Sequence, residues 1–305
     1  MERPFTQVDV FTDTLTQGNP LAVVHGADGL DDETMAAFAR WTNLSETTFL
    51  CAPTDPAAAS ADAGIVLADG HELGGYNPVA GFGSAGEAKM YDGLLRLDGA
   101  PGLPGFEPAL AAELPTPNAD ATVWTVPLRE GVTFSDGSTF EASDVVATYE
   151  AIEDPASASE VRSSFDMITS VVELDPHTVE FRLAHPYAAF ETKLLIGIAA
   201  SEALAEPGLA AESELNTAPV GTGPYKLVDL TPDRAVFEAN EDYWDGAPEV
   251  KKLTLLYVPD DNTRAQRMAS GEIDGTTLPP VLARTFDDRE AMTLSANTSA
   301  DWRGV

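Results

Sequence analysis

A single glutamate near the N-terminus, Glu46, lies in a setting that could support proton transfer. It follows Asn43 and Ser45, where an apolar helical pattern gives way to a β-prone run, Thr47–Cys51. A carboxylate can act as a general acid or base when its pKa is raised and its partners are in place. A lone glutamate between two elements is more commonly a solvated or capping residue. The local sequence therefore permits acid–base chemistry without requiring it.

Metal and redox chemistry find little support in the sequence. The four histidines lack the spacing of metal ligands, and we expect surface or turn positions for them: His25, His71, His177 and His185. Cys51 is the one cysteine, so no disulfide can form within the chain. We therefore expect no metal site and no cofactor.

The charge of the chain excludes several classes of partner. Its 305 residues carry 50 acidic and 17 basic side chains, a formal net charge of −33. Such a surface repels nucleic acid and anionic lipid. No apolar run reaches the roughly 18 residues of a membrane span. The N-terminus lacks a basic start followed by an apolar run, so we expect no signal peptide and, for the chain as written, a cytoplasmic location.

The first segment predicts short strands around a helix. Val8–Phe11 and Leu21–His25 are β-prone and flank a turn signal, Gly18-Asn19-Pro20. A helix is predicted to begin at Asp31 or Asp32, with one mostly apolar face formed by Met35, Phe38, Ala39 and Thr42. Thr47–Cys51 then predicts a strand.

The second segment is dominated by antiparallel patterns. Alternation over Trp124, Val126 and Leu128 predicts a strand. Turn signals between β-prone runs predict hairpins at Asp136-Gly137, Asp175-Pro176-His177 and Thr231-Pro232-Asp233.

Helical spacing and a closing α/β pattern complete the second segment. Helices are predicted over Ala85–Leu95 and Ser143–Ile152. The last unit predicts the start of a parallel α/β lobe, because strand, helix and strand patterns follow one another with Ser270-Gly271 as the helix stop: Leu253–Val258, Asn262–Ala269 and Glu272–Asp274.

The string Asn43-Leu44-Ser45-Glu46-Thr47-Thr48-Phe49, with Gly18-Asn19-Pro20-Leu21, resembles the N-terminus of the PhzF-like isomerases, which share the diaminopimelate-epimerase fold. The resemblance covers residues 1–58 and implies that Glu46 is a catalytic acid/base. The family continues into a Gly-His-Pro-Thr segment that this sequence lacks. We therefore expect this segment to be inactive.

From residue 65 onward the sequence is similar to family 5 extracellular solute-binding proteins, the peptide and nickel receptors of ABC importers. The matching pieces follow one another in order along the segment: Tyr91-Asp92-Gly93-Leu94-Leu95, Phe106–Ala111, Trp124–Val132, Phe134-Ser135-Asp136-Gly137, Ser143-Asp144-Val145-Val146, Pro219–Tyr225, Asn240–Trp244 and Ser270–Asp274. The helix start Glu141-Ala142-Ser143-Asp144 departs from the family pattern and alters its capping box.

The second resemblance implies a fold, a partner and a site. The expected fold is α+β with an α/β part: an incomplete lobe of the type II, large peptide-binding class, preceded by a partial epimerase-like β-α-β segment. The implied ligand is a peptide or related small solute, delivered to an ABC permease at the cell surface or in the periplasm. In the family, certain segments face or support the ligand cleft, and they contribute Tyr91, Gly221, Thr222, Gly223, Tyr225 and Trp244. The alternative is that these are core aromatics and a rigid turn.

Together the two resemblances predict a composite chain. We expect an epimerase-like segment at 1–58, a junction at 59–64 and the N-terminal half of a solute-binding domain at 65–305. Because the chain ends at Val305, soon after the second lobe begins, we expect impaired ligand binding. The preferred function is solute capture rather than catalysis. The alternatives are an isomerase using Glu46 and a chimera without a selected function.

Overall fold

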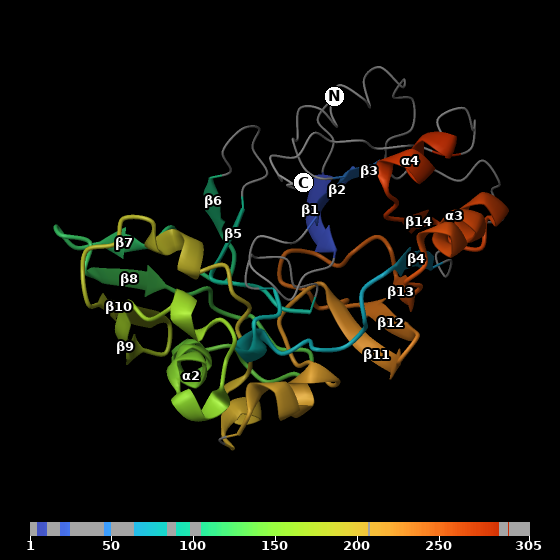
Figure 1. Cartoon of the computed structure of the whole chain (residues 1–305). Helices are drawn as coiled ribbons and strands as arrows, with labels where there is room; N and C mark the ends of the chain where they lie inside the picture. Colours follow the sequence, from blue (N-terminus) through green and yellow to red (C-terminus); the bar gives the residue numbers. More distant parts are fainter. Residues whose placement is uncertain are drawn as a thin grey trace.

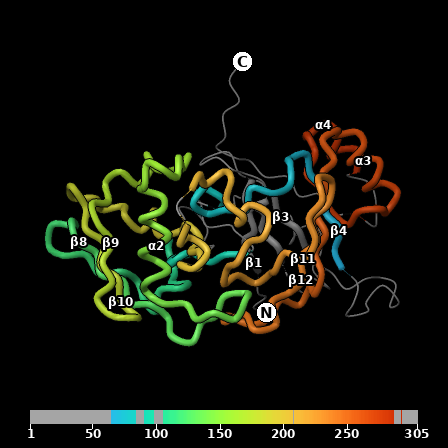
Figure 2. The backbone as a smooth tube through the Cα atoms, turned by 90° about the horizontal axis from the view of Figure 1, so that it is seen from below, coloured from blue at the N-terminus to red at the C-terminus, as the bar shows by residue number. Residues whose placement is uncertain are grey.

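The described part of the chain is organised around two larger β-sheets (Figure 1). The computed structural model describes residues 5–10, 19–24, 46–49, 64–83, 90–97, 105–206, 208–286 and 292, the first three ranges as backbone only. Seen from below, the sheet containing β8–β10 and the sheet containing β11 and β12 lie at opposite ends of the molecule (Figure 2). No described helix is both long and apolar enough to cross a bilayer.

The first sheet is antiparallel and has the order β7-β8-β10-β9. Its strands are β7 (Thr116–Pro117), β8 (Val123–Pro127), β9 (Ile168–Asp175) and β10 (Thr178–Leu183). The predicted alternation is confirmed, because Trp124, Val126 and Leu128 are all buried. The hairpin predicted at Asp175-Pro176-His177 is also confirmed, since β9 and β10 pair on either side of that turn. The Asp136-Gly137 turn is present between the bridged residues Thr133 and Thr139.

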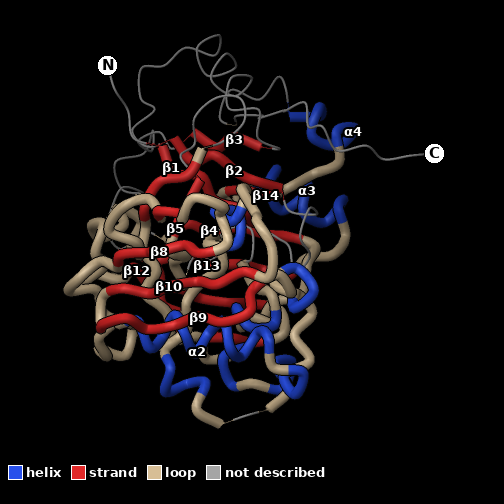
Figure 3. Tube along the Cα trace, turned by 90° about the vertical axis from the view of Figure 1, so that its left-hand side faces the viewer, coloured by secondary structure: helices blue, strands red, loops and turns tan. Residues whose placement is uncertain are grey.

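The helix predicted over Ser143–Ile152 is confirmed as α2 (Ala142–Glu153), which packs against this sheet (Figure 3). Val145, Tyr149 and Ile152 are fully buried on its inner face, whereas Val146 is only partly buried. Glu141 is the N-cap residue, and its backbone N–H donates to Asp144 Oδ2 at 2.8 Å. The altered start therefore keeps a reciprocal contact of the capping-box type.

The second sheet mixes antiparallel and parallel strands in the order β11-β12-β13-β4-β14. Its strands are β11 (Tyr225–Thr231), β12 (Arg234–Ala239), β13 (Lys252–Tyr257), β4 (Ile65–Asp69) and β14 (Gly275–Thr276). The hairpin predicted at Thr231-Pro232-Asp233 is confirmed by β11 and β12. β4 lies parallel to both β13 and β14. The first described strand after residue 63 is therefore an interior strand of a sheet whose other strands come more than 150 residues later in the sequence.

The strand–helix–strand unit is present, but its last strand is displaced. Helix α3 (Asp261–Ser270) ends where Gly271 takes a left-handed φ of 72°. The strand predicted over Glu272–Asp274 is wrong, since the paired residues are Gly275 and Thr276. The physical reason is the helix cap: the residues after Gly271 carry the chain back to β4, where the Asp274 N–H donates to Val66 O at 2.7 Å.

The helix predicted over Ala85–Leu95 is wrong for its described part, residues 90–95. Met90–Leu94 are irregular, and Leu95–Leu97 form strand β5, which pairs with β6 (Phe106–Pro108). Tertiary hydrogen bonds replace helical ones here: the Ile198 N–H donates to Asp92 O at 3.0 Å, and the Leu95 N–H donates to Leu194 O at 2.9 Å. Residues 84–89 lie outside the described part.

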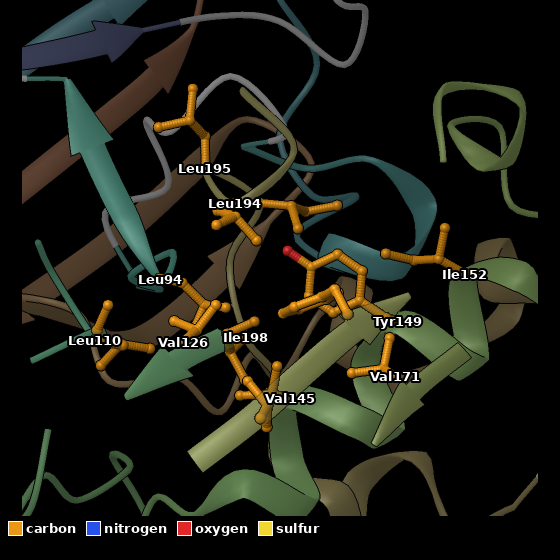
Figure 4. Close-up of a cluster of buried hydrophobic side chains, with 14 of the residues drawn as sticks. Leu94, Leu110, Val126, Val145, Tyr149, Ile152, Val171, Leu194, Leu195 and Ile198 are labelled. Carbon is orange, nitrogen blue, oxygen red and sulfur yellow. The ribbon is translucent and has the colours of Figure 1, made fainter. Parts of the chain in front are cut away.

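The buried apolar residues form two main cores. The first core lies between the four-stranded sheet and α2 and includes Leu94, Val126, Val145, Tyr149 and Ile198 (Figure 4). The second core lies against the five-stranded sheet and includes Tyr76, Tyr91, Ala199, Phe237 and Leu253. A small cluster of Ala68, Val258 and Ile273, with Met268 of α3 packed against it, lies at the parallel strands.

Short helices also occur between the strands of the described chain. They are η1 (Pro78–Ala80), η2 (Pro155–Ser157), η3 (Arg162–Ser164), η4 (Phe190–Lys193), η5 (Ser201–Leu204), η6 (Ala210–Glu212), η7 (Glu214–Asn216), α4 (Pro280–Ala283) and η8 (Arg284–Phe286).

The N-terminal strands form a separate sheet of order β1-β2-β3. β1 (Phe5–Val10) pairs antiparallel with β2 (Asn19–Val24), and β2 pairs parallel with β3 (Glu46–Phe49). β1 begins three residues before the predicted run, and the other two strands agree with prediction to within two residues at either end. The predicted helix beginning at Asp31 or Asp32, and Cys51, lie outside the described residues.

Candidate functional site

The carboxyl ends of three parallel strands meet at one edge of the five-stranded sheet. β4 ends at Asp69, between the ends of β13 and β14. In open α/β sheets, ligands bind outside the carboxyl ends of the strands, where neighbouring strands lead away in different directions. β13 continues into α3, whereas β4 continues into residues 70–75. This edge is therefore a candidate ligand site on topology alone.

Asp69 organises the edge from a buried position. Asp69 is only 5 % exposed. Thr277 Oγ1 donates to Asp69 Oδ2 at 2.6 Å, and the His71 N–H donates to Asp69 Oδ1 at 2.9 Å. His71 Nδ1 also contacts Asp69 Oδ1, while the His71 side chain is 67 % exposed. The carboxylate thus holds the chain after β4 against the chain after β14 and leaves the imidazole at the surface.

Arg264 of α3 fills the space beneath this edge and is itself buried. Its Nη1 donates to Val258 O at 2.6 Å, and its Nε donates to Thr277 O at 3.1 Å. Its Nη2 pairs with Asp261 Oδ1. A Cβ at Gly70 would lie 2.9 Å from Arg264 Nη1, so the glycine lets the chain run directly over the guanidinium. The planar fork of arginine suits this role, because it donates in several fixed directions at once.

The residues singled out from sequence lie elsewhere, and most of them are buried. Tyr91 is 2 % exposed in the second core, and burial raises the pKa of its phenol. Gly221 lies against the Tyr91 segment: a Cβ there would lie 2.0 Å from Met90 O and 2.6 Å from Tyr91 Cδ1. The Gly223 N–H donates to Met90 O at 3.0 Å. Gly221 is therefore required by the close approach of two backbones.

Tyr225 begins β11 and packs against the second core as a partly buried residue. Its hydroxyl donates to Val250 O at 3.1 Å, and burial raises its pKa to about 12. This side chain therefore stays neutral and anchors the chain ahead of β13.

Thr222 and Trp244 converge on a carboxylate that sequence reasoning had not singled out, Asp92. Thr222 Oγ1 donates to Asp92 Oδ2 at 3.0 Å, and Trp244 Nε1 donates to the same oxygen at 2.9 Å. Tyr243 OH donates to Asp92 Oδ1 at 3.0 Å. Burial raises the pKa of Asp92, and these three hydrogen bonds offset part of that rise.

Two arginines lie over the Trp244 ring. The Arg129 guanidinium carbon is 4.2 Å from the ring centroid, within cation–π range, and that of Arg96 is 5.8 Å away. Arg96 also bonds Glu107 and Asp245 at 2.6 Å each. The signals in the sequence were the two short motifs, Tyr91-Asp92-Gly93 and Asn240–Trp244, but nothing in their spacing showed that they meet.

The structure brings Tyr91, Gly221, Thr222, Gly223 and Trp244 together around the Asp92 segment, whereas Asp69 and Arg264 lie apart at the strand edge. Glu46 is the first residue of β3, and its side chain lies outside the described part. Among the described residues, no group of three His, Cys, Asp or Glu side chains could hold a metal ion.

Comparison with known proteins decides the family. Residues 105–303 match the model for bacterial extracellular solute-binding proteins, family 5 (the "Middle" region). That range is more than half of the 305 residues. The chain belongs to this family. Its members are binding proteins, which agrees with the prediction of a non-enzymatic role. Residues 8–62 match a second model, phenazine biosynthesis-like protein, as the resemblance at the N-terminus predicts.

Individual relatives agree with the family 5 assignment. The chain is 38 % identical to protein XP55 of Streptomyces lividans over 242 residues, which covers 79 % of this chain and 44 % of that protein. It is 34 % identical to the glutathione-binding protein GsiB of Escherichia coli K12 over 189 residues, which covers 60 % of this chain and 35 % of that protein.

Solved structures of similar fold support the same assignment. NikZ from Campylobacter jejuni, in complex with Ni(L-His), has a TM-score of 0.69 and 28 % identity, covering 74 % of this chain and 45 % of its own. DppA from Helicobacter pylori, in complex with the peptide STSA, has a TM-score of 0.63 and 26 % identity, covering 74 % and 49 %. This family 5 chain thus spans less than half the length of these relatives. The boundary at residues 59–64 stays a prediction, because residues 51–63 lie outside the described part.

Proposed function

We propose that this chain acts in solute capture for an ABC importer, with peptides or related small solutes as ligands. The observation that carries the proposal is the family 5 match over residues 105–303. The names of the relatives point to small peptides and a histidine-chelated metal: glutathione for GsiB, the peptide STSA for DppA and Ni(L-His) for NikZ. The role implies an ABC permease as partner and a place at the cell surface or in the periplasm.

We propose the edge formed by Asp69, His71 and Arg264 as the ligand-facing part of the chain. The peptide backbone after β4 is held in place by the Asp69 carboxylate and by the Arg264 side chain beneath Gly70. A backbone held in this way can hydrogen-bond an extended peptide without selecting its side chains. In this proposal Tyr91, Gly221–Gly223, Tyr225 and Trp244 support the lobe behind that edge, since most of them are buried.

Isothermal titration calorimetry on the full chain tests this proposal. The ligands are glutathione, a mixture of tetrapeptides and the nickel–histidine complex, and His71→Ala is compared with His185→Ala, an exposed histidine elsewhere. We expect binding of at least one ligand, weakened by about threefold to tenfold in His71→Ala and unchanged in His185→Ala. Absence of heat with every ligand at millimolar concentration contradicts solute capture by this chain. Equal binding by both variants contradicts the edge as its site.

The alternative of an isomerase rests on Glu46 and on the match over residues 8–62. Its test is deuterium exchange from solvent into a small-molecule substrate, with Glu46→Gln as the control. We expect no exchange above the buffer rate from either protein. Exchange by the wild-type chain alone would reverse the ranking of the two functions.

A further inference from the structure

The chain passes between the two cores several times, and four of these crossings lie around Asp92. The chain leaves the second core at Tyr91 and enters the first at Leu94; it returns between Ile198 and Ala199. It crosses again between Val220, packed on the first core, and Tyr225, packed on the second. A fourth crossing runs from Phe237 in the second core to Trp244, packed on the first.

Asp92 lies in the first of these crossings and bonds to each of the other three. Its backbone carbonyl accepts from the Ile198 N–H at 3.0 Å. Its backbone N–H donates to Thr222 Oγ1 at 3.3 Å, while the same hydroxyl donates to the Asp92 carboxylate. Tyr243 OH and Trp244 Nε1 complete the set from the fourth crossing.

Glycines allow the crossings to approach so closely. A Cβ at Gly93 would lie 2.5 Å from Leu195 O, and a Cβ at Gly197 would lie 2.6 Å from Tyr91 Cβ. With the contact of Gly221 described above, the Asp92 segment is enclosed by backbone on two sides. The backbones of the crossings therefore lie close together here, and three side chains bond to the one carboxyl group between them.

We propose that Asp92 is the positioning residue of a joint that makes the two cores move as one rigid body. Its carboxyl group accepts three hydrogen bonds from two different crossings, and leaving such buried donors unpaired is costly. Two contacts hold the Trp244 side chain in place. Its indole N–H donates to the Asp92 carboxyl group, and the Arg129 guanidinium carbon lies 4.2 Å from the ring centroid. Loosening this joint lets the five-stranded sheet, which carries the Asp69 edge, open independently of the four-stranded sheet. This proposal concerns the fold and stands whether or not the chain binds a solute.

Asp144 provides a matched control. It is also a buried aspartate, 2 % exposed, and burial likewise raises its pKa. Its carboxylate accepts from the Glu141 and Ser201 N–H groups at 2.8 Å each, and both of these flank residues of the first core. Asp144→Asn therefore perturbs the first core without removing any hydrogen bond of Asp92.

Native-state hydrogen exchange on the full chain, read by mass spectrometry, tests the joint. In the wild type we compare the slowest-exchanging amides of β8 and β10 with those of β12 and β13. We expect the exchange rates of the two sets to agree within about threefold, as in one cooperative unit. In Asp92→Asn we expect the exchange rates of the two sets to separate by about tenfold or more, because asparagine replaces one acceptor oxygen with a donor and leaves a buried donor unpaired. In Asp144→Asn the two sets should stay matched.

Two results would overturn the proposal. One is an Asp92→Asn protein whose two sheets still exchange together, as in Asp144→Asn. The other is a wild type whose sheets already open independently. If Asp92→Asn does not fold, Trp244→Phe decides the question: it removes one donor and should still separate the two sets, by about threefold to fivefold. Matched exchange in Trp244→Phe then counts against the joint.

Discussion

Val66 and Asp274 exchange two hydrogen bonds across 208 positions of sequence. The Val66 N–H donates to Asp274 Oδ2 at 2.7 Å, and the Asp274 N–H donates to Val66 O at 2.7 Å. The first residues after the junction are thereby bound to the unit that follows α3. β4 is thus an integral part of the family 5 lobe, even though the matched family region begins only at residue 105.

Asp274→Ala should destabilise the fold modestly. The variant loses the side-chain bond to Val66 but keeps the backbone bond, and the carboxylate is exposed to solvent. We expect the free energy of unfolding to fall by about 1 kcal/mol, because water screens such a bond. Urea denaturation measures this. Asp242→Ala, an exposed acid after β12, is the control, and an equal effect in both variants contradicts the role given to Asp274.

Gly221→Ala should be strongly destabilising. The added methyl group would lie 2.0 Å from Met90 O, which is backbone and cannot rotate away. We expect the free energy of unfolding to fall by about 3 kcal/mol, because an extra methyl group in a close-packed interior forces the surrounding backbone to move. Gly208→Ala is the control, because a Cβ at Gly208 would have nothing within 4 Å of it. Thermal unfolding of both variants checks the prediction, and a tolerant Gly221→Ala would show that the Met90 segment can move.

Arg264→Lys should weaken the strand edge while keeping the charge. Lysine cannot reproduce the separate bonds from Nε to Thr277 O and from Nη1 to Val258 O. We expect a loss of about 2 kcal/mol in the free energy of unfolding, because buried carbonyls lose their donor. Arg267→Lys on the same helix should cost little, since Arg267 makes a partly exposed contact with Glu272 at 3.5 Å. Equal losses in the two variants would contradict the buried role of Arg264.

The stability of wild type relative to Asp92→Asn should depend on pH. Burial raises the pKa of Asp92 above its ordinary 3.8, with the Coulomb attraction of Arg96 acting in the opposite direction. The folded protein therefore binds this proton more tightly than the unfolded chain does. The resulting stability is present in acid and is lost as pH rises through the folded pKa. Asparagine does not titrate, so the difference in Tm, wild type minus variant, should decrease as the pH rises above the ordinary pKa of 3.8 and through the folded pKa. A difference in Tm that grows with pH would show that the three hydrogen bonds lower the pKa of Asp92 by more than burial raises it.

Local patterns predicted the elements whose partners lie nearby in sequence. The hairpins β9–β10 and β11–β12 follow from alternation around a turn, and α2 follows from helical spacing over Ser143–Ile152. The same rule failed at Met90–Leu95, where apolar spacing predicts a helix but long-range hydrogen bonds to Leu194 and Ile198 hold an irregular segment that leads into β5. Periodicity reports which side chains are buried, and it carries no information about which distant backbone supplies the bonds.

The candidate site, like the fold, was only partly predictable from the sequence. The motifs containing Tyr91, Gly221–Gly223 and Trp244 were visible in the sequence, and so was the family they indicate. Their convergence on Asp92 was not, because four crossings distant in sequence meet there. The strand edge was hidden for a related reason: Asp69 and Arg264 look like ordinary charged residues until β4 is placed between β13 and β14.

The sequence by itself determined the family, the acidic surface and the antiparallel elements, since these depend on composition, ordered motifs and short-range spacing. Tertiary structure alone decided that β4 is an interior strand, that the Met90–Leu94 segment is irregular and that Asp92 bonds to segments from both cores. Each of these depends on how a backbone donor or a buried charge is satisfied by residues far along the chain. An unpaired buried polar group costs free energy, so each one must find a hydrogen-bond partner in the folded chain. That partner can lie at any distance along the sequence, and short-range spacing does not identify it.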